Sequence, residues 1–327
     1  MTGLQHVFGP VPSRRLGHSL GVDIIPRKLC TLDCIYCELG RTDKRALRRK
    51  VYVPPSEILP EIRSAVKAGG IDTITFSGSG EPTLNSSLGF MIHDVKSWTI
   101  LPVAVITNGT LLFMPDVRKD LLEADLVLPS LNAATTAAFE RTNRPHPRLR
   151  LDTILEGLRQ FRFEYHGRFW LEIFLVEGVN DSKEDIAALK SAVARIRPDR
   201  IQLNTVVRPP SEPSAQRLSM KRMEEIREHF GDTCEIIPDW AAQPNDSADL
   251  PIHKDIVAMV SRRPMTATDI AASIRLPLAA IMKQLAFLEE SGAVRLSFYG
   301  GEWYYRSAGR KSSVRPSPAQ RSIGGLS

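Results

Sequence analysis

The stretch Cys30-Thr-Leu-Asp-Cys34-Ile-Tyr-Cys37 places three of the chain's four cysteines within eight residues. The first strand that we expect, Ser19–Ile25, ends shortly before this stretch, so the three thiols lie on a loop that follows a strand. A loop that curls around a metal presents several thiolates to one centre, and soft thiolate ligands favour zinc or an iron–sulfur cluster. The spacing therefore predicts a metal centre held by Cys30, Cys34 and Cys37.

Zinc and an iron–sulfur cluster make different demands on the rest of the chain. A structural zinc site closes its shell with four ligands, which here would have to come from Cys234 or from a histidine such as His18. A cluster with three thiolates instead leaves one iron open to a chelating small molecule. For Cys234, which lies on a predicted strand, we expect a buried and inert thiol.

The C-x3-C-x2-C spacing, with Tyr36 directly before the third cysteine, resembles the signature of the radical S-adenosylmethionine (radical SAM) superfamily. The resemblance implies two cofactors, a 4Fe–4S cluster and S-adenosylmethionine. It also implies that the cluster reductively cleaves S-adenosylmethionine, and that the resulting 5′-deoxyadenosyl radical abstracts a hydrogen atom from a substrate that the sequence does not identify. A reductase such as a flavodoxin or ferredoxin would be the electron donor.

The resemblance extends to the loops after the following strands. Ser77-Gly-Ser-Gly80-Glu81 looks like the family's Gly-Gly-Glu segment, with Ser79 in place of the first glycine, and Gly80 is expected to bring backbone close to the methionine part of the cofactor. By resemblance, the cofactor-binding residues are Tyr36, Gly80, Glu81, Thr107, Asn108, Ser130, Asn132 and Asn204. Candidate substrate contacts are Glu172, Asn132, Asn204, Arg208, Arg144 and His146, and no residue is assigned a catalytic role.

The opening segment Gly9–Asp23 and the tripeptide Arg144-Pro-His146 resemble one branch, which includes the wyosine-forming tRNA enzymes. That branch implies a second cluster held by three further cysteines, mostly upstream of the radical motif. This chain has no cysteine before Cys30. We therefore expect a single cluster, and wyosine-type tRNA modification stands as the lesser alternative.

Short apolar runs alternate with helical patterns through the first 240 residues. The expected strands are Ser19–Ile25, Asp72–Ser77, Val103–Thr107, Asp125–Leu131, Phe169–Val176, Ile201–Val207 and Cys234–Pro238. The expected helices are Ser56–Ala68, Leu84–Trp98, Pro115–Glu123, Thr135–Arg141, Leu151–Phe161, Lys183–Ile196 and Met220–Phe230. Such alternation predicts an α/β fold, a partial or full (β/α) barrel of parallel strands over residues 1–240, with the chemistry on loops at the carboxyl ends of the strands.

A second pattern follows a polar linker, 241–251. A helix over Ile252–Ser261, a capping box at Thr266–Asp269, a helix from Pro277 and a hairpin turning at Gly300-Gly301 predict a small winged helix-turn-helix domain over 252–306. The basic tail, 307–327, is expected to be disordered. This domain motivates the alternative function of a redox-sensing, DNA-binding regulator, and nucleic acid is kept as an alternative partner.

The bulk composition limits the class of protein. With 43% hydrophobic and 24% charged residues, the chain is typical of a globular protein. It contains no apolar run of the roughly 18–20 residues that span a bilayer, and its first residues do not form a signal peptide. Because its few cysteines are clustered rather than spread as in a disulfide scaffold, we expect a cytoplasmic enzyme without a membrane partner.

Overall fold

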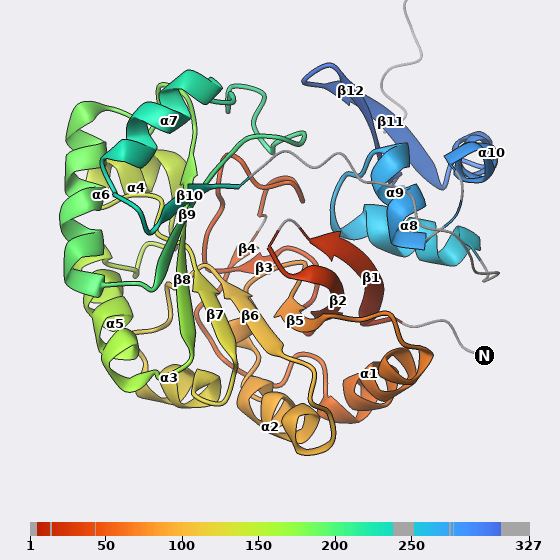
Figure 1. Cartoon of the computed structure of the whole chain (residues 1–327), viewed down its shortest axis with the longest axis horizontal. Helices are drawn as coiled ribbons and strands as arrows, with labels where there is room; N and C mark the ends of the chain where they lie inside the picture. Colours follow the sequence, from red (N-terminus) through yellow and green to blue (C-terminus); the bar gives the residue numbers. More distant parts are fainter. Residues whose placement is uncertain are drawn as a thin grey trace, which may run out of the picture.

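The computed structural model describes residues 5–13, 15–42, 44–237, 252–274, 276 and 278–308. Its main body is an eight-stranded sheet with the order β1-β2-β5-β6-β7-β8-β9-β10. All neighbouring strands in it are parallel except β1 and β2. Because β1 and β10 end the order and do not pair, the expected barrel is a partial one, and Figure 1 shows it as an open, curved sheet.

The strands of this sheet are β1 (Val7–Ser13), β2 (Gly17–Asp23), β5 (Thr73–Ser77), β6 (Val103–Thr107), β7 (Leu126–Pro129), β8 (Arg168–Leu175), β9 (Arg200–Thr205) and β10 (Cys234–Ile236). The helices that follow its outer side are α1 (Pro55–Ala68), α2 (Leu88–Trp98), α3 (Pro115–Leu121), α4 (Thr136–Asn143), α5 (Leu151–Glu164), α6 (Lys183–Ile196) and α7 (Met220–Glu228). The expected elements are present, with ends that shift by a few residues.

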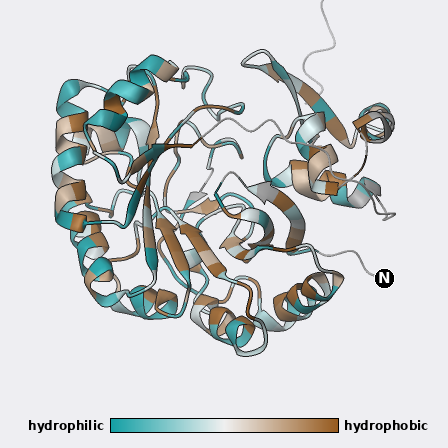
Figure 2. Cartoon of the chain, viewed as in Figure 1, coloured by the Kyte–Doolittle hydropathy of each residue, from teal (hydrophilic) through white to brown (hydrophobic). Residues whose placement is uncertain are grey.

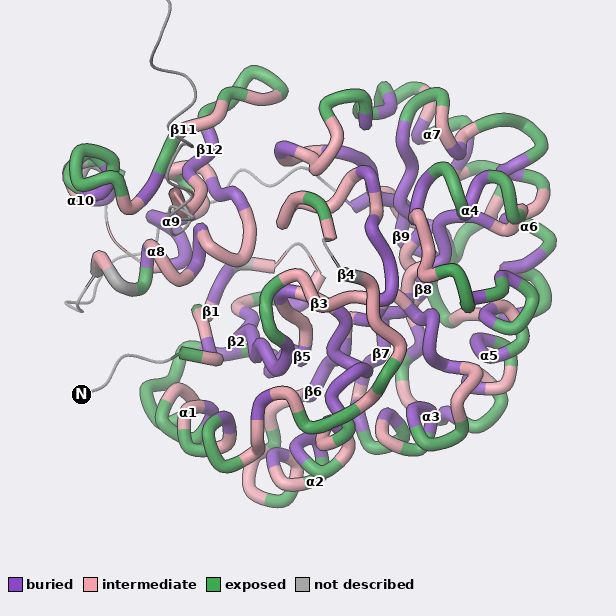
Figure 3. The backbone as a smooth tube through the Cα atoms, turned by 180° about the vertical axis from the view of Figure 1, so that it is seen from behind, coloured by how far each residue is buried: buried purple, intermediate pink, exposed green. Residues whose placement is uncertain are grey.

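The two faces of the sheet have different chemistry because successive side chains of a strand point to opposite faces. On β5, Ile74 and Phe76 belong to the apolar core under the helices, whereas Thr73 and Thr75 alternate with them. The Thr75 hydroxyl meets the Ser19 hydroxyl of β2 at 2.7 Å on the inner face. Figure 2 shows the apolar strands within their ring of amphipathic helices, and Figure 3 shows the same strands as buried. The inner face is mixed, because Ala104 of β6 and Leu126 and Leu128 of β7 alternate with the outer core and form an apolar cluster with Leu16.

Two local expectations need correction. The helix expected from Leu84 begins only at Leu88, because Pro82–Leu84 form a 3₁₀ turn and Asn85 leaves the helical path. The Asn85 amide donates to the carbonyl oxygens of Ile24 and Val53, at 2.9 and 3.0 Å, which ties this turn to the end of β2. The sequence analysis also missed β1, which pairs antiparallel with β2 and extends the sheet at its edge.

The C-terminal part has the expected order of three helices and a hairpin: α8 (Ile252–Arg262), α9 (Ala267–Ile274), α10 (Leu278–Glu290), β11 (Val294–Tyr299) and β12 (Glu302–Ser307). The capping box is present, since the Asp269 backbone N–H donates to Thr266 Oγ1 at 3.1 Å. The predicted linker, 241–251, and the predicted tail beyond residue 308 lie outside the described residues. In the described ranges, no helix is both long and apolar enough to span a bilayer.

The C-terminal part packs on the edge of the sheet and reaches the loops at its open end. Val11 of β1 joins the apolar core formed by α8, α9 and α10. The Tyr304 hydroxyl of β12 donates to the Val207 carbonyl at 2.8 Å, just after β9. Arg208 lies 3.6 Å from both Glu38 and Asp269, so one guanidinium links the segment after Cys37 to the start of α9.

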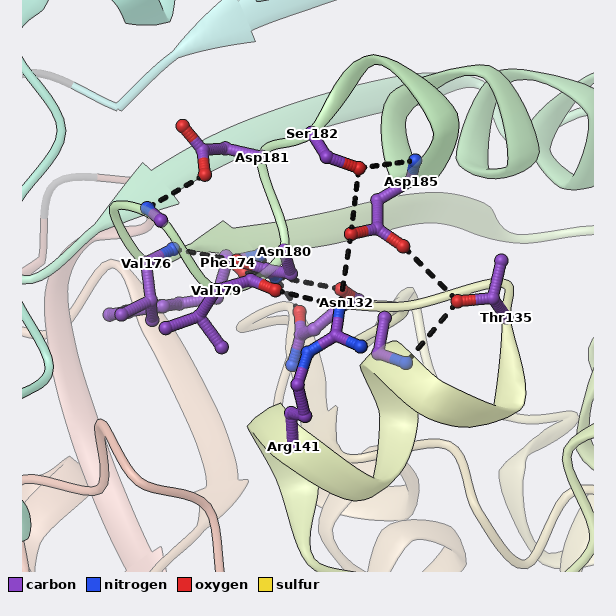
Figure 4. A network of polar contacts seen from close by, with 12 residues as sticks. Asn132, Thr135, Arg141, Phe174, Val176, Val179, Asn180, Asp181, Ser182 and Asp185 are labelled. Atoms are coloured by element: carbon purple, nitrogen blue, oxygen red, sulfur yellow. Dashed lines mark hydrogen bonds and ion pairs between the residues drawn. The ribbon is translucent and has the colours of Figure 1, made fainter.

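A buried polar network fixes the loop after β8 (Figure 4). Asn180, which is fully buried, donates to the carbonyl oxygens of Asn132 and Phe174 at 2.8 and 2.9 Å and accepts from the Val176 N–H at 2.8 Å. Asn132 Oδ1 in turn accepts from the Phe174 N–H at 2.8 Å. One side chain thus satisfies three buried backbone groups of two adjacent segments, and it holds Asn132 in place.

Replacing Asn180 with alanine should lower the free energy of unfolding by about 3 kcal/mol, because buried backbone groups lose their partners. Chemical denaturation followed by circular dichroism measures this change. Asp181→Ala is the matched control, since Asp181 accepts from the Gly178 N–H in an exposed turn, and it should cost less than about 1 kcal/mol. Equal losses in the two variants would contradict the role given to Asn180.

Candidate functional site

The cysteine loop starts in a short strand, β3 (Leu29–Cys30), which pairs in parallel with β4 (Lys44–Arg45). It leaves the carboxyl end of β2, the edge at which parallel strands of this kind of fold carry their chemistry. All three thiols are partly buried. The loop backbone turns tightly at its end, since the Cys37 N–H donates to the Cys34 carbonyl at 3.2 Å.

The end of α4 and the segment after it, residues 142–146, run beside the cysteine loop and bond to it through backbone. The Asp33 N–H donates to the Asn143 carbonyl at 3.0 Å, and the Ile35 N–H donates to the Thr142 carbonyl at 3.0 Å. The His146 N–H donates back to the Thr31 carbonyl at 3.0 Å. These bonds act as a clamp that fixes the path of the loop between its first and third cysteines.

A second segment, after β9, holds the other side of the loop. The Ser211 hydroxyl donates to the carbonyl oxygens of Cys34 and Ile35 at 2.9 and 2.8 Å. The Glu212 N–H also donates to the Ile35 carbonyl at 3.0 Å. The Glu212 carboxylate pairs with Arg144 at 2.6 Å, which joins the two clamping segments, and the Arg144 partner lowers the pKa of Glu212.

Each of the three sulfur atoms accepts from one nitrogen donor. Asn108 Nδ2 lies 3.4 Å from Cys30 Sγ, and Asn143 Nδ2 lies 3.2 Å from Cys34 Sγ. Lys28 Nζ lies 3.7 Å from Cys37 Sγ. Of these donors, the sequence analysis singled out Asn108 alone. Asn143 and Lys28 were missed, although Asn143 directly precedes the Arg144-Pro-His146 tripeptide that drew attention to this segment.

Burial controls the protonation of these thiols. Burial is the larger cause that raises the pKa of Cys34 to about 12, and the negative charge of the neighbouring Cys37 adds to this rise. Burial also raises the pKa of Cys30 and of Cys37, although the Lys28 ammonium opposes the rise at Cys37. Metal binding requires thiolates, so loading this site must release protons.

Tyr36 packs into the open end of the barrel, as its place beside Cys37 suggested. Its ring stacks on Phe174 of β8, with centroids 4.0 Å apart and planes 14° apart. Its hydroxyl accepts from the Asn132 amide and, at 3.3 Å, from the Asn143 amide. Tyr36 therefore connects the cysteine loop to β8 and to Asn132, one of the predicted cofactor-binding residues.

Packing within the protein gives a physical reason for Gly80 that the sequence did not predict. A Cβ atom at this position would lie 1.9 Å from the Leu29 carbonyl oxygen and 2.8 Å from Ile25 Cγ2, so Gly80 is required by the approach of the chain just before Cys30. The adjacent Ser79 donates its backbone N–H to Asp23 Oδ1 at 3.1 Å, and its hydroxyl also bonds that carboxylate. The glycine-containing loop is thus packed directly against the base of the cysteine loop.

The Glu81 carboxylate is occupied by protein donors. It accepts from the backbone N–H and the hydroxyl of Thr83, from the Thr107 hydroxyl at 2.6 Å and from the Asn108 N–H at 2.7 Å. Burial raises the pKa of Glu81, and these four donors oppose that rise. Glu81 therefore fixes the loops after β5 and β6 relative to each other, and it places Asn108 beside Cys30.

The remaining predicted residues lie around the same open end. Ser130 forms an isolated bridge with Glu172, and the buried Asn204 accepts from the Thr205 N–H at 3.0 Å. The Glu172 carboxylate pairs with Arg15, which comes from the turn between β1 and β2. Arg208, Arg144 and His146, by contrast, serve contacts between loops in this structure, as described above.

The two fourth ligands considered for zinc lie at the other end of the sheet. His18 is at the start of β2, where its backbone N–H donates to Asp72 at 2.7 Å. Cys234 is buried at the start of β10, paired with Ile201 at the start of β9. Among the described residues, no three His, Cys, Asp or Glu side chains converge as the ligands of a single metal ion would. Neither His18 nor Cys234 can close a zinc shell around the cysteine loop.

Comparison with known proteins agrees with this geometry. The model of the radical SAM superfamily matches residues 24–189, which include the cysteine loop and the loops after β5, β6 and β7. The chain belongs to the radical SAM superfamily. Its cofactors are those of that superfamily, a 4Fe–4S cluster and S-adenosylmethionine.

Two relatives and one solved structure illustrate the range of similarity. A UPF0026 protein of Helicobacter pylori strain J99 is 34% identical over 271 residues, which cover 81% of this chain and 87% of that protein. A protein of Brachyspira hyodysenteriae named GTPase Obg is 38% identical over 305 residues, which cover 92% of this chain but only 45% of that longer protein. A radical SAM methyltransferase from Sphaerobacter thermophilus shares the fold, with a TM-score of 0.53, 20% identity and coverage of 67% of this chain and 66% of that one.

The residues of the site fit these cofactors. Three thiols on one loop, each with a nitrogen donor, suit a 4Fe–4S cluster, whose fourth iron would then have no protein ligand. The buried Oδ1 atom of Asn143 has no hydrogen-bond partner among the described residues, so it is free to accept from a polar group bound beside the loop. Asn108, Ser130, Asn132 and Asn143 line a hollow beside the cysteine loop, so polar groups are available there to a polar cofactor.

Gly80→Ala should reduce the iron that the chain retains after anaerobic reconstitution, because the added methyl group displaces the backbone just before Cys30. The expectation that a side chain at Gly80 weakens cofactor binding stays a prediction beside this one. Gly69→Ala is the control: its φ of +81° strains any other residue, but a Cβ there has open space around it, so the iron content should stay unchanged. Full iron loading of Gly80→Ala, measured by iron and sulfide analysis, would overturn the packing argument.

Proposed function

We propose that this chain is a radical SAM enzyme in which Cys30, Cys34 and Cys37 hold a 4Fe–4S cluster. The single observation that carries the assignment is the loop at the carboxyl end of β2, whose three thiols each meet a nitrogen donor and whose path is fixed by two other loops. When bound, the cluster supplies the electron that cleaves S-adenosylmethionine to methionine and a 5′-deoxyadenosyl radical.

In this proposal the chain's own residues position the cofactors and exclude water. Asn108, Asn143 and Lys28 stabilise negative charge on the sulfurs. Tyr36, stacked on Phe174, closes one side of the site, and the inner-face residues Ser130 and Asn204 face the cofactor. The 5′-deoxyadenosyl radical would abstract hydrogen from a substrate bound within this open end, and a flavodoxin or ferredoxin would supply electrons.

The regulator alternative has no observation in its favour. The exposed side chains of α10, the helix that would enter the DNA groove in a winged helix-turn-helix domain, include Leu278, Met282 and Phe287. Groove-reading helices present hydrogen-bonding and cationic groups to bases and phosphates instead. We retain the winged-helix name as a proposal about the shape of residues 252–306, without DNA binding.

Reconstitution tests the proposed ligands. Replacing Cys30, Cys34 or Cys37 with alanine should abolish the cluster absorbance and the formation of 5′-deoxyadenosine on anaerobic reduction with S-adenosylmethionine. Cys234→Ala should keep both, because Cys234 is buried at the other end of the sheet. The wild-type chain should hold roughly four irons, as one cluster of this kind requires. A value near eight would instead favour the wyosine-type alternative, and loss of the cluster in Cys234→Ala would overturn the ligand set.

The nitrogen donors predict a redox effect. Asn143→Leu should make the midpoint potential of the cluster more negative by roughly tens of millivolts, since a hydrogen bond to a ligating sulfur stabilises the reduced state. Potentiometric titration followed by electron paramagnetic resonance measures this shift. Gln160→Leu, which removes an amide that donates to Glu156 on the exposed side of α5, is the control and should keep the wild-type potential. An unchanged potential in Asn143→Leu would show that its amide does not act on the sulfur.

A further inference from the structure

A cleft between the cysteine loop and the C-terminal hairpin is lined by an unusual number of arginines. Arg27, Glu38 and Gly40 line it from the side of the cysteine loop, and Arg263, Arg295 and Arg306 line it from the other side. Glu38 and Gly40 lie within three residues after Cys37 in the chain. The cleft therefore adjoins the site that holds the thiols and is separate from the loops proposed to bind the cofactor.

The arginines of this cleft repel one another. Arg295 of β11 and Arg306 of β12 are cross-strand partners, and like charges directly opposite each other destabilise a β-ladder. Burial is the main cause that lowers the pKa of Arg306, and the positive charges of Arg295 and Arg27 lower it further. The Nε atom of Arg306 is buried without a hydrogen-bond partner among the described residues. Arg27 and Arg295 are exposed to solvent, whereas Arg306 has a buried nitrogen from which a bound anion would accept.

Among the described residues that line the cleft, the one carboxylate belongs to Glu38. The acid in the cleft, Glu38, lies 3.6 Å from Arg208 and is paired there. In the part of the chain that the structure describes, Arg27, Arg295 and Arg306 form no ion pair with a side chain. Three positive charges thus converge on one polar cleft. Their total charge exceeds the single negative charge of one carboxylate group.

We propose that this cleft binds a phosphate group of the substrate. Guanidinium groups match phosphate oxygens in pairs, and a phosphate accepts several such donors at once. The inference rests on the proposed function in one respect, that the bound molecule is the substrate of the radical reaction. A phosphate held here brings the rest of its molecule next to the cysteine loop. The group is either a phosphomonoester of a small molecule or a phosphodiester of an RNA chain.

Binding to the full-length protein tests the cleft directly. The probes are inorganic phosphate, uridine 5′-monophosphate and a single-stranded oligouridine of ten nucleotides, with calorimetry for the first two and fluorescence anisotropy for a labelled RNA. The double variant Arg295→Gln/Arg306→Gln and the single variant Arg27→Gln should each weaken binding about tenfold or more, because each loses charged donors. Arg195→Gln, on the exposed face of α6, is the matched control and should bind as the wild type does.

The two sources of phosphate give different results. Tight binding of the mononucleotide, with no gain for RNA, identifies a small phosphorylated substrate. Tight binding of RNA alone, weakening steeply with salt, identifies a phosphodiester chain. Both outcomes support the cleft. Because Arg27 is exposed on a different element from the hairpin pair, its variant keeps the test valid if the double variant does not fold.

Two outcomes overturn the inference: no binding of any probe to the wild type, or equal binding by the wild type and the cleft variants. The proposed function fails separately, if the reconstituted wild type does not form 5′-deoxyadenosine. Arginine-dependent binding of phosphate by a protein that cannot cleave S-adenosylmethionine would leave the cleft intact and refute the enzyme assignment. The thermal midpoint gives an independent check, since phosphate should raise it for the wild type and not for the double variant.

Discussion

The backbone hydrogen bonds between the cysteine loop and residues 142–146, at the end of α4 and just after it, are the constraint on which the rest of the site depends. A loop of eight residues with three thiols has many conformations, and fixing one of them has an entropic cost. Here the N–H groups of Asp33 and Ile35 and the carbonyl of Thr31 are paired with residues 142–146. Ser211 and Glu212 hold the opposite side. The loop is thus shaped by two distant segments before any ligand is considered.

This clamp explains why the sulfur donors come from separate parts of the chain. Asn143 reaches Cys34 because the clamping segment itself carries it, and Asn108 reaches Cys30 because Glu81 fixes the loop after β6. Lys28 precedes the loop and turns toward Cys37. Each donor is positioned by an element of the fold, so the electrostatics of the thiols follow from the barrel's connectivity. The arginine-lined cleft lies beside the same loop, and in our proposal it holds the phosphate group of the substrate.

The parts of this account that the sequence predicted are those encoded locally. The strand–helix alternation was strong enough to place β6 at Val103–Thr107 and α6 at Lys183–Ile196 with the right bounds, and the cysteine spacing by itself indicated the family. The roles of Asn143 and Lys28 were not predicted, because a donor to sulfur is defined by a tertiary contact and not by spacing in the sequence. The contact of Gly80 with Leu29, fifty-one positions earlier in the chain, was not predicted for the same reason. The strand β1 was not predicted because it contains Gly and Pro, which are unusual inside strands, and it pairs at the edge of the sheet.

Electron paramagnetic resonance of the reduced, reconstituted protein, recorded with and without S-adenosylmethionine, tests the central claim most directly. If Cys30, Cys34 and Cys37 hold a 4Fe–4S cluster with one open iron, the reduced cluster gives a signal that changes when S-adenosylmethionine is added. Adenosine, which lacks the methionine part of the cofactor, is the control and should leave the signal unchanged. A cluster signal that does not change on addition of S-adenosylmethionine would contradict the account. So would a protein that binds zinc and gives no cluster signal.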